Sequence, residues 1–266
     1  MNDTLAKLVE RLDDRVLLTA GVIPWSCPIP SFGDFELSSI ATLGLNPSNR
    51  EFVDENGREL VGDERRFQTL RSLGLRRWSA ASGSHLSKIA DSCKSYFAAK
   101  PYDTWFRRLD YLLTGAEASY YGMLGGACHL DLIPYATAAK WGELSSKQRA
   151  ILLDCSGDSL GMLLRDSAVQ IIVLNGRSVV DLFEAVTCVR LETQRMATWS
   201  LPRKSSPRVA GIAYSGVVSS ISGVPLGREI RVLGFNHNIQ SSFGVTTVVT
   251  NAIRQWLTDS YAQVSA

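Results

Sequence analysis

Polar side chains stand at the ends of four short apolar runs or directly after them, and they are of kinds that serve in catalysis and ligand binding. The runs are 40–45, 127–133, 169–174 and 229–235, and the side chains are Asn46, Ser48, Asn49, Glu51, Asp131, Asn175, His237, Asn238 and Gln240. Amides, carboxylates, a hydroxyl and an imidazole can bind a polar ligand, position water, or stabilise charge that develops in a reaction. They are therefore the candidate functional residues.

The elements that must position these side chains are short strands alternating with helices. Helical periodicity is expected near 4–17, 65–99, 103–115, 145–165, 177–186 and 244–262, and residues 210–218 are expected as a further edge strand. Such alternation is typical of a mostly parallel sheet covered on both faces. We predict an α/β fold, a three-layer α/β/α sandwich around a short sheet. Because ligands bind at the carboxyl ends of such strands, the polar residues are expected on one rim.

Length and composition favour one domain. The 266 residues are 45% hydrophobic, which allows one large core, and we expect a single domain over 1–266 with residues 1–35, a helix and a Pro-rich loop, packed on it. Basic residues number 28 against 26 acidic, a net charge of +2. A dedicated nucleic-acid coat would be far more basic, so any contact with DNA must come from local patches.

Several functional classes lack their usual signatures. The five cysteines are scattered and none of the three histidines is spaced for zinc, so we expect no metal site and no disulfide framework. There is no phosphate-binding Walker loop, no dinucleotide fingerprint and no nucleophile elbow. The first residues do not resemble a signal peptide, and no apolar run approaches about 18 residues. We therefore expect a soluble, cytoplasmic monomer.

Three segments resemble the motifs of one enzyme family. The segment 44–48, Gly-Leu-Asn-Pro-Ser, resembles the first catalytic motif of the uracil-DNA glycosylase superfamily, whose mismatch-specific and single-strand-selective branches carry Gly-x-Asn-Pro-Gly. Glu51 stands where the iron–sulfur branches have a glutamate, and the loop 236–240 resembles the second motif, usually His-Pro-Ser. Asp131 falls where the family usually has a base-reading asparagine. The similarity lies in order and spacing across residues 40–240.

The resemblance implies a monofunctional DNA glycosylase, a hydrolase that flips a base out of DNA and cleaves its N-glycosidic bond to leave an abasic site. It implies that Asn46 positions water and that His237 stabilises the departing base. Ser48, Phe52, Asp131 and Asn175 are then expected to contact the base. The metal-free branches of the family imply no cofactor.

Two departures from the uracil pattern bear on the target base. A carboxylate at Asp131 can accept a hydrogen bond from the exocyclic amine of cytosine, whereas it would meet uracil acceptor to acceptor. Ser48 stands where classical uracil enzymes have a tyrosine that blocks substituents at C5. Together they favour a cytosine with a bulky C5 group, such as the hydroxymethyl- or glucosylated cytosine of some phage genomes. That target would give the protein a role in antiviral defence.

Contacts with the DNA backbone are expected from two segments. One is the basic, Ser/Pro-rich loop with Arg203, Lys204 and Arg208, which could equally be a solvated loop. The other comprises the residues after His237, Asn238, Ile239 and Gln240, of which Ile239 and Gln240 could fill the vacated base stack.

Each candidate also has a structural interpretation. Asn46 is a common turn residue before proline, and His237 could cap the final helix. Glu51 is expected as a structural or ion-pairing residue, His129 as a packed histidine on the same face as Asp131, and His85 as a helix cap or surface residue.

Three other functions stay open. A repair glycosylase would release uracil or a mispaired thymine, a non-catalytic reader of modified DNA would flip a base without cleaving it, and a nucleoside hydrolase would act on free nucleosides. The sequence leaves the exact base, the strand preference and the oligomeric state undecided.

Overall fold

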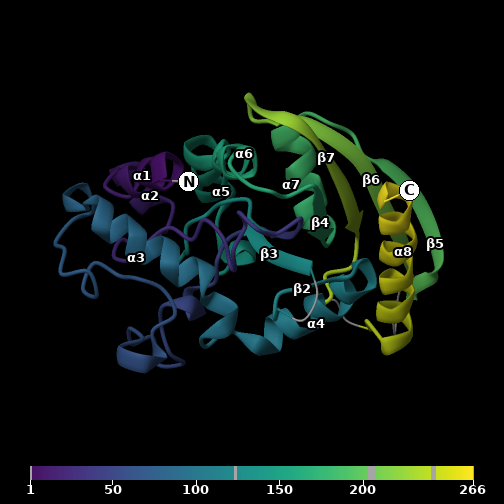
Figure 1. Cartoon of the computed structure of the whole chain (residues 1–266), viewed down its shortest axis with the longest axis horizontal. Coiled ribbons are helices and arrows are strands. Elements are labelled where there is room, and N and C mark those ends of the chain that lie inside the picture. Colours follow the sequence, from purple (N-terminus) through teal and green to yellow (C-terminus); the bar gives the residue numbers. More distant parts are fainter. Residues whose placement is uncertain (1, 123–124, 203–207, 241–243, 266) are drawn as a thin grey trace.

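The structure is a computed structural model that describes residues 2–122, 125–202, 208–240 and 244–265. Within these ranges seven strands form one mixed sheet in the order β2-β3-β1-β4-β7-β6-β5, flanked by helices (Figure 1). β2, β3, β1, β4 and β7 run parallel, and β6 and β5 are antiparallel additions at one side. The predicted α/β class with a mostly parallel sheet is confirmed.

The four predicted apolar runs are all strands of this sheet. The strands are β1 (Ile40–Gly44), β2 (Ala118–Ser119), β3 (Gly125–Asp131), β4 (Ile171–Asn175), β5 (Glu192–Leu201), β6 (Val209–Ile221) and β7 (Val224–Phe235). The expectation of an edge strand at 210–218 is wrong in its position, because β6 lies between β7 and β5. The edge strand is β5, whose residues are mostly exposed and therefore show no clear apolar pattern.

The helices differ from the prediction at three places. The α-helices are α1 (Asn2–Arg11), α2 (Arg15–Thr19), α3 (Gly83–Lys94), α4 (Asp103–Leu113), α5 (Ser146–Ser156), α6 (Ser159–Arg165), α7 (Arg177–Thr187) and α8 (Thr247–Ser265). The stretch 4–17 is two helices, 145–165 is split after Ser156, and only 83–94 of 65–99 is α-helical. Residues 65–77 hold no helix, and Gly74 among them is in the left-handed region at φ +69°, which a right-handed helix cannot contain. His85 caps α3 through its bond to Ser82, as expected.

β1 lies in the middle of the parallel strands, and this explains its composition. All five of its residues are buried, because β3 and β4 flank it and both of its faces are covered. α7 packs against β4, β6 and β7, whereas α8 packs against β5 with α4 beside it. In Figure 1 α7 and α8 lie on opposite sides of β7.

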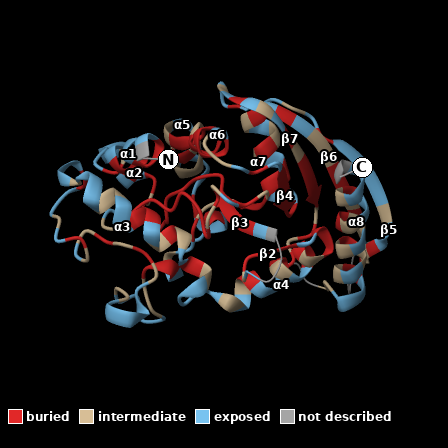
Figure 2. Ribbon diagram, viewed as in Figure 1, coloured by how far each residue is buried: buried red, intermediate tan, exposed pale blue. Residues whose placement is uncertain are grey.

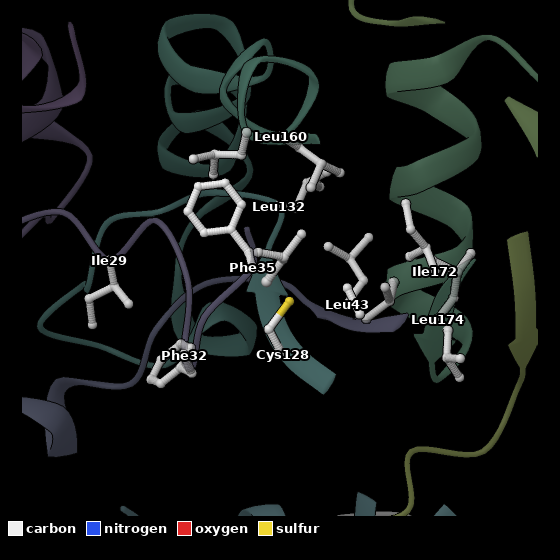
Figure 3. Close-up of a cluster of buried hydrophobic side chains, with 14 of the residues drawn as sticks. Ile29, Phe32, Phe35, Leu43, Cys128, Leu132, Leu160, Ile172 and Leu174 are labelled. Atoms are coloured by element: carbon white, nitrogen blue, oxygen red, sulfur yellow. The ribbon is translucent and has the colours of Figure 1, made fainter. Parts of the chain in front are cut away.

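The hydrophobic core follows the parallel strands. Buried residues concentrate along β1, β3 and β4, and exposed residues lie on the outer surfaces of the helices and on β5 (Figure 2). Side chains from the N-terminal loop, three strands and α6 meet there, and those labelled in Figure 3 are Ile29, Phe32, Phe35, Leu43, Cys128, Leu132, Leu160, Ile172 and Leu174. The apolar residues of the strands thus form the core, and the polar residues that follow them lie at the carboxyl ends of the strands.

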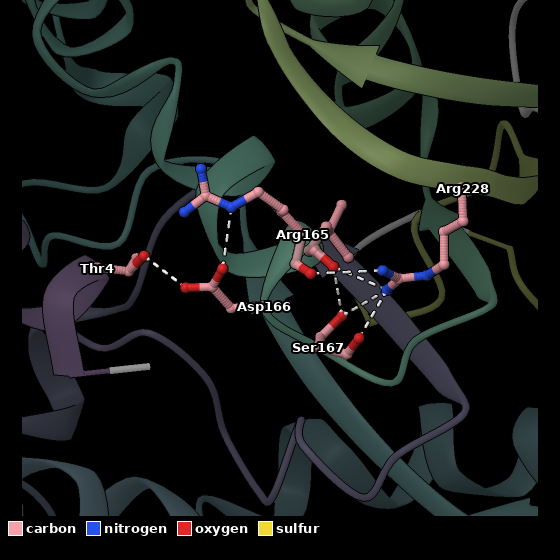
Figure 4. Close-up of polar contacts among 6 residues, drawn as sticks. Thr4, Arg165, Asp166, Ser167 and Arg228 are labelled. Atoms are coloured by element: carbon pink, nitrogen blue, oxygen red, sulfur yellow. Dashed lines mark hydrogen bonds and ion pairs between the residues drawn. The ribbon is translucent and has the colours of Figure 1, made fainter.

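Polar contacts join distant segments where α6 leads into β4 (Figure 4). The guanidinium of Arg228, on β7, donates to the carbonyl oxygens of Leu164, Ser167 and Val169. Asp166 accepts hydrogen bonds from the Thr4 hydroxyl on α1 and from Arg165. The end of α6 is thus connected both to the N-terminal helix and to β7. The carbonyl groups at a helix end have no partner within the helix, and Arg228 on β7 donates hydrogen bonds to them.

Candidate functional site

A cavity of about 890 Å³ lies at the carboxyl ends of the parallel strands. After β1 the chain continues to β2 and β3 on one side of the sheet, and after β4 it continues to β5, β6 and β7 on the other. Strand ends that diverge in this way leave a crevice between them, which is where open α/β sheets bind ligands. The volume lies within the range of small-molecule sites, about 300–1,000 Å³.

Most of the polar residues singled out from the sequence do line this cavity. They are Asn46, Ser48, Asn49, Glu51, Asp131, Asn175, Asn238 and Gln240, and His129 lines it as well. They come from segments far apart in the chain and meet because the strands that precede them are neighbours in the sheet.

Asn46, directly after β1, is held by its amide nitrogen. Nδ2 lies 2.9 Å from the hydroxyl oxygen of Thr137, 3.2 Å from the Pro47 carbonyl and 3.4 Å from the Tyr135 carbonyl. Carbonyls only accept, and the Thr137 hydroxyl already donates to the Ala139 carbonyl, so the group facing them must be the NH₂. Oδ1 is then the oriented acceptor of this side chain, and it makes no hydrogen bond within the described residues.

Glu51 is a buried carboxylate of the site. Ser48 caps the short 3₁₀ helix Asn49–Glu51, its hydroxyl oxygen accepting from the backbone N–H of Arg50, and this turn brings Glu51 against the cavity. Its side chain is buried, and the Tyr96 hydroxyl donates to its Oε2 at 2.9 Å. Burial raises the pKa of Glu51 to about 7, against the lowering effects of Arg66 and of the Tyr96 bond; Asp131 adds to the increase. Glu51 can therefore take or give a proton near neutral pH.

Asp131 and His129 form the floor of the cavity on β3. They are two residues apart, so their side chains lie on the same face of the strand. The parallel register places Thr42 beside His129 and Gly44 beside Asp131. Asp131 Oδ1 lies 3.5 Å from His129 Nε2, and both residues are buried. A Cβ on Gly44 would stand 2.3 Å from Asp131 Oδ1 and 3.0 Å from His129 Nε2. Only glycine therefore leaves room for this pair. The expectation that His129 shares a face with Asp131 is confirmed.

Asn175 joins three segments at the opposite wall. Its Oδ1 accepts from the backbone N–H of Ile239 at 3.2 Å, and its Nδ2 donates to Oε1 of Gln240 at 2.8 Å. Gln240 in turn donates to the Trp105 carbonyl on α4. Gly176, at φ +102°, permits the close approach, because a Cβ there would lie 3.1 Å from that of Asn238. Both polar atoms of Asn175 are engaged, so its side chain holds the loop 236–240 in place.

His237 does not line the cavity. It is buried, and its Nε2 lies 2.7 Å from the carbonyl oxygen of Trp199 on β5. Burial lowers the pKa of His237, so the ring is neutral at pH 7. The imidazole thus fastens the end of β7 to β5 and is not brought together with Asn46 and Asp131. It does not cap the final helix either, since α8 begins at Thr247.

Phe52 and Ile239 also stay out of the cavity. Phe52 is 1% exposed and packs on Trp25 and Phe67, and Ile239 is 2% exposed. A side chain buried to this extent cannot enter a base stack in this conformation. Arg208 is exposed and does not line the cavity, while Arg203 and Lys204 lie outside the described residues.

The cavity mouth carries groups that the sequence did not single out. Aromatic rings of Tyr102, Trp105 and Trp141 line it, as do the cations Arg50, Lys140 and Arg177. Arg50 and Lys140 are exposed and make no ion pair within the described part of the chain. Their sequence signal is position alone: Arg50 and Arg177 follow β1 and β4, Lys140 and Trp141 lie in the connection after β3, and Tyr102 and Trp105 lie at the start of α4. A cavity with flat rings at its wall and cations at its mouth suits a planar, polar ring attached to phosphates.

Comparison with known proteins gives no family for the chain. No protein-family profile matches the sequence, and no curated protein matches it. Over the described residues there is no group of three or more His, Cys, Asp or Glu side chains that could hold a metal ion, and no helix long and apolar enough to cross a membrane.

Proposed function

We propose that the protein is a DNA glycosylase that hydrolyses the N-glycosidic bond of a flipped-out base and leaves an abasic site. The observation that carries the proposal is the pairing, in one cavity, of a buried carboxylate whose pKa is about 7 with an amide oriented by its nitrogen. The carboxylate, Glu51, can take a proton from water, and the amide, Asn46, can orient that water. Asn46 stands in the segment 44–48, which resembles the first catalytic motif of the uracil-DNA glycosylases, and Glu51 stands where their iron–sulfur branches have a glutamate.

The chemistry assigns a task to each of these groups. Glu51 accepts a proton from a water molecule, and Asn46 Oδ1 accepts a hydrogen bond from the other hydrogen of that water. The water oxygen bonds to C1′ of the sugar while the bond from C1′ to the base nitrogen breaks. The electron pair of that bond leaves with the base, so negative charge gathers on the base and needs hydrogen-bond donors in the cavity to stabilise it.

The proposed target is a cytosine that carries a bulky C5 group. Asp131 lines the floor of the cavity, where its carboxylate can accept from the exocyclic amine of cytosine. Ser48 is exposed at the mouth and is small, so that end of the cavity is open to a substituent. Phage DNA with hydroxymethyl- or glucosylated cytosine has this chemistry, which makes defence against phage the proposed role.

The uracil-DNA glycosylase-like form of the three-layer sandwich belongs to the same proposal. Five parallel strands with β1 in their middle, and motif-like segments at the ends of β1 and β7, support it. The partner in this proposal is DNA, held at its phosphates by the cations at the cavity mouth.

The test is a base-release assay on matched oligonucleotides, single- and double-stranded, that contain uracil, cytosine, 5-hydroxymethylcytosine or its glucosylated form. Alkali converts each abasic site into a strand break. Glu51→Gln is the key variant, because glutamine keeps the shape and the acceptor for Tyr96 but cannot take a proton. Glu59→Gln is the matched control, because Glu59 also accepts from a hydroxyl, that of Thr69, but does not line the cavity.

Release of modified cytosine by the wild type and by Glu59→Gln, with a loss of about 100-fold or more in Glu51→Gln, is the expected result. Release of uracil alone would keep the reaction and overturn the base assignment. Binding to modified DNA with no base released from any substrate would overturn the reaction and favour a reader of modified DNA.

A further inference from the structure

A buried chain of hydrogen bonds runs under the cavity from Tyr120 through Thr42 to His129. Thr42 on β1 and His129 on β3 are partners in register, so their side chains point to the same face. The hydroxyl oxygen of Thr42 lies 2.7 Å from Nδ1 of His129 and is hydrogen-bonded to the Tyr120 hydroxyl as well. The water chemistry proposed for Glu51 and Asn46 makes no use of this chain.

The direction of the hydrogen bonds follows from what each group can do. Burial raises the pKa of Tyr120 well above its usual value, so the phenol keeps its hydrogen. Within the described residues its hydroxyl has Thr42 as its hydrogen-bond partner, and a buried hydroxyl without an acceptor is unfavourable. Tyr120 therefore donates to Thr42, which leaves the Thr42 hydrogen for Nδ1 of His129.

A neutral imidazole that accepts at Nδ1 carries its hydrogen on Nε2. Nε2 is the ring nitrogen that lies 3.5 Å from Asp131 Oδ1 at the cavity floor. The opposite direction would set a bare Nε2 against that carboxylate and leave the Tyr120 hydrogen without an acceptor. Both considerations put the hydrogen on Nε2, where it is a donor beside the cavity.

The His129 ring is also held in position by its neighbours. Trp105 and Phe106 meet it edge to face at centroid distances of 4.9 and 5.4 Å, and Phe32 lies 5.4 Å away. These contacts and the hydrogen bond between Thr42 and Nδ1 hold the ring with Nε2 on the side of Asp131. Its donor therefore points in one direction before any ligand binds, as electrostatic catalysis requires.

We propose that His129 is the imidazole that donates to the departing base, and that Tyr120 and Thr42 are positioning residues that keep the hydrogen on its Nε2. This role rests on the proposed glycosidic cleavage. As the bond from C1′ to the base nitrogen breaks, its electron pair stays on the base, and Nε2–H donates a hydrogen bond to the base oxygen that shares the charge. His129 keeps its hydrogen throughout and transfers no proton to the base. The substrate class is a pyrimidine, whose O2 is conjugated with the nitrogen that leaves.

The hydrogen position can be measured without any substrate. The chain has three histidines, so nitrogen-15 spectra of histidine-labelled protein can be assigned by substituting His85 and His237 in turn. We expect the His129 signals of a neutral ring with hydrogen on Nε2. Thr42→Val, which removes the hydroxyl but keeps the shape, should give a mixture of the two neutral forms, and Thr42→Ser should restore the wild-type pattern. An unchanged pattern in Thr42→Val would overturn the relay.

Kinetics then test the contact with the base. His129→Phe keeps a ring among aromatic neighbours but removes the donor, so the single-turnover rate of base release should fall about 100-fold while DNA affinity changes little. Thr42→Val and Tyr120→Phe should each lower the rate about tenfold, because only part of the molecules hold the competent form. Thr42→Ser should release the base at close to the wild-type rate.

Two outcomes separate this inference from the function on which it rests. If the wild type releases no base, the proposed function fails, and the spectra still decide the relay. If the wild type releases a base at the same rate as His129→Phe, while His237→Gln abolishes release, the role of His129 is overturned and the cleavage stands.

Discussion

Glu51 and Glu59 both accept a hydrogen bond from a hydroxyl group, Tyr96 for the first and Thr69 for the second. Their surroundings separate them. Glu51 is 3% exposed and its pKa is about 7, because water that would stabilise its charge is excluded. Glu59 is partly exposed and lies 3.9 Å from Arg71. At the scale of the residue, the environment and not the residue type makes a general base.

The rate of base release should therefore depend on the ionisation of Glu51. A carboxyl group must be charged to take a proton from water, so kcat/KM should fall as the pH drops through about 7. The measurement is kcat/KM from pH 5 to 9. A flat profile across that range would contradict the role of Glu51 as the base.

Stability should show the opposite trend. The pKa of Glu51 is higher in the folded protein than in the unfolded chain, where it is near 4.5, so the fold favours the protonated form. The stabilisation is complete below about pH 4.5 and is lost as the pH rises to about 7, by roughly 3 kcal/mol. The unfolding free energy of Glu51→Gln, measured in urea, should rise relative to the wild type by up to about that amount between pH 5 and 8. A difference between the two proteins that stays constant from pH 5 to 8 would contradict the raised pKa of Glu51.

The sequence placed the polar residues at the right strand ends but could not say which way they point. Asn46 and Asp131 reach the cavity, whereas His237, two residues after β7, turns to the Trp199 carbonyl of a strand that the sequence did not reveal. Glu51 was expected as a structural residue because burial, which raises its pKa, depends on Tyr96 and other distant segments. Residue type and spacing carry no information on such contacts.

At the scale of the element, apolar runs correctly predicted the buried strands but did not predict β5, which is exposed. β1, β3 and β4 are covered on both faces, so their sequences are continuously apolar. β5 is an edge strand with polar, exposed residues, and its pairing with β6 is what identifies it. The stretch 65–82 has helical spacing of apolar residues, yet it is folded by local turns, among them the bonds between Thr69 and Ser72.

The end of β1 gives a prediction at this scale. Gly44→Ala should displace Asp131 and His129, because the new Cβ would stand 2.3 Å from Asp131 Oδ1. We expect a loss of about 1–3 kcal/mol in unfolding free energy. The rate of base release should also fall, because Asp131 and His129 would no longer be held in position. Gly83→Ala, at the first residue of α3 with no atom within 4 Å of the new Cβ, is the control and should cost nothing. Equal stability of the two variants would contradict the packing argument.

At the scale of the whole molecule, charge is nearly balanced and its placement matters. The net charge is only +2, so a general attraction to DNA is weak, and Arg50 and Lys140 at the cavity mouth are exposed cations without ion pairs within the described residues. DNA that enters the cavity base-first would bring its phosphates to this rim. The substrate should then be attracted locally, at the point where the base must enter.

Removal of the two cations should weaken binding to DNA and reduce its dependence on salt. The double variant Arg50→Ala, Lys140→Ala should lower the slope of log affinity against log salt by about 1.4–1.8, because each lost phosphate contact removes roughly 0.7–0.9. Titrations of a labelled oligonucleotide at several salt concentrations give the slope. Lys88→Ala, an exposed cation on α3 that does not line the cavity, is the control, and the same slope in the control and the double variant would contradict the assignment.

The central position of β1 also governs how the molecule folds. Thr42 pairs in register with His129 on one side and with Val173 on the other, so the floor of the cavity joins segments about ninety and a hundred and thirty residues apart. Strand pairs that far apart in sequence form slowly, because closing the long loop between them costs entropy before the new contacts contribute any stability. The helices can be present in milliseconds while β1 is still without partners. Refolding followed by helix content should therefore run ahead of refolding followed by the environment of His129, and the site is complete only when the last strand has paired.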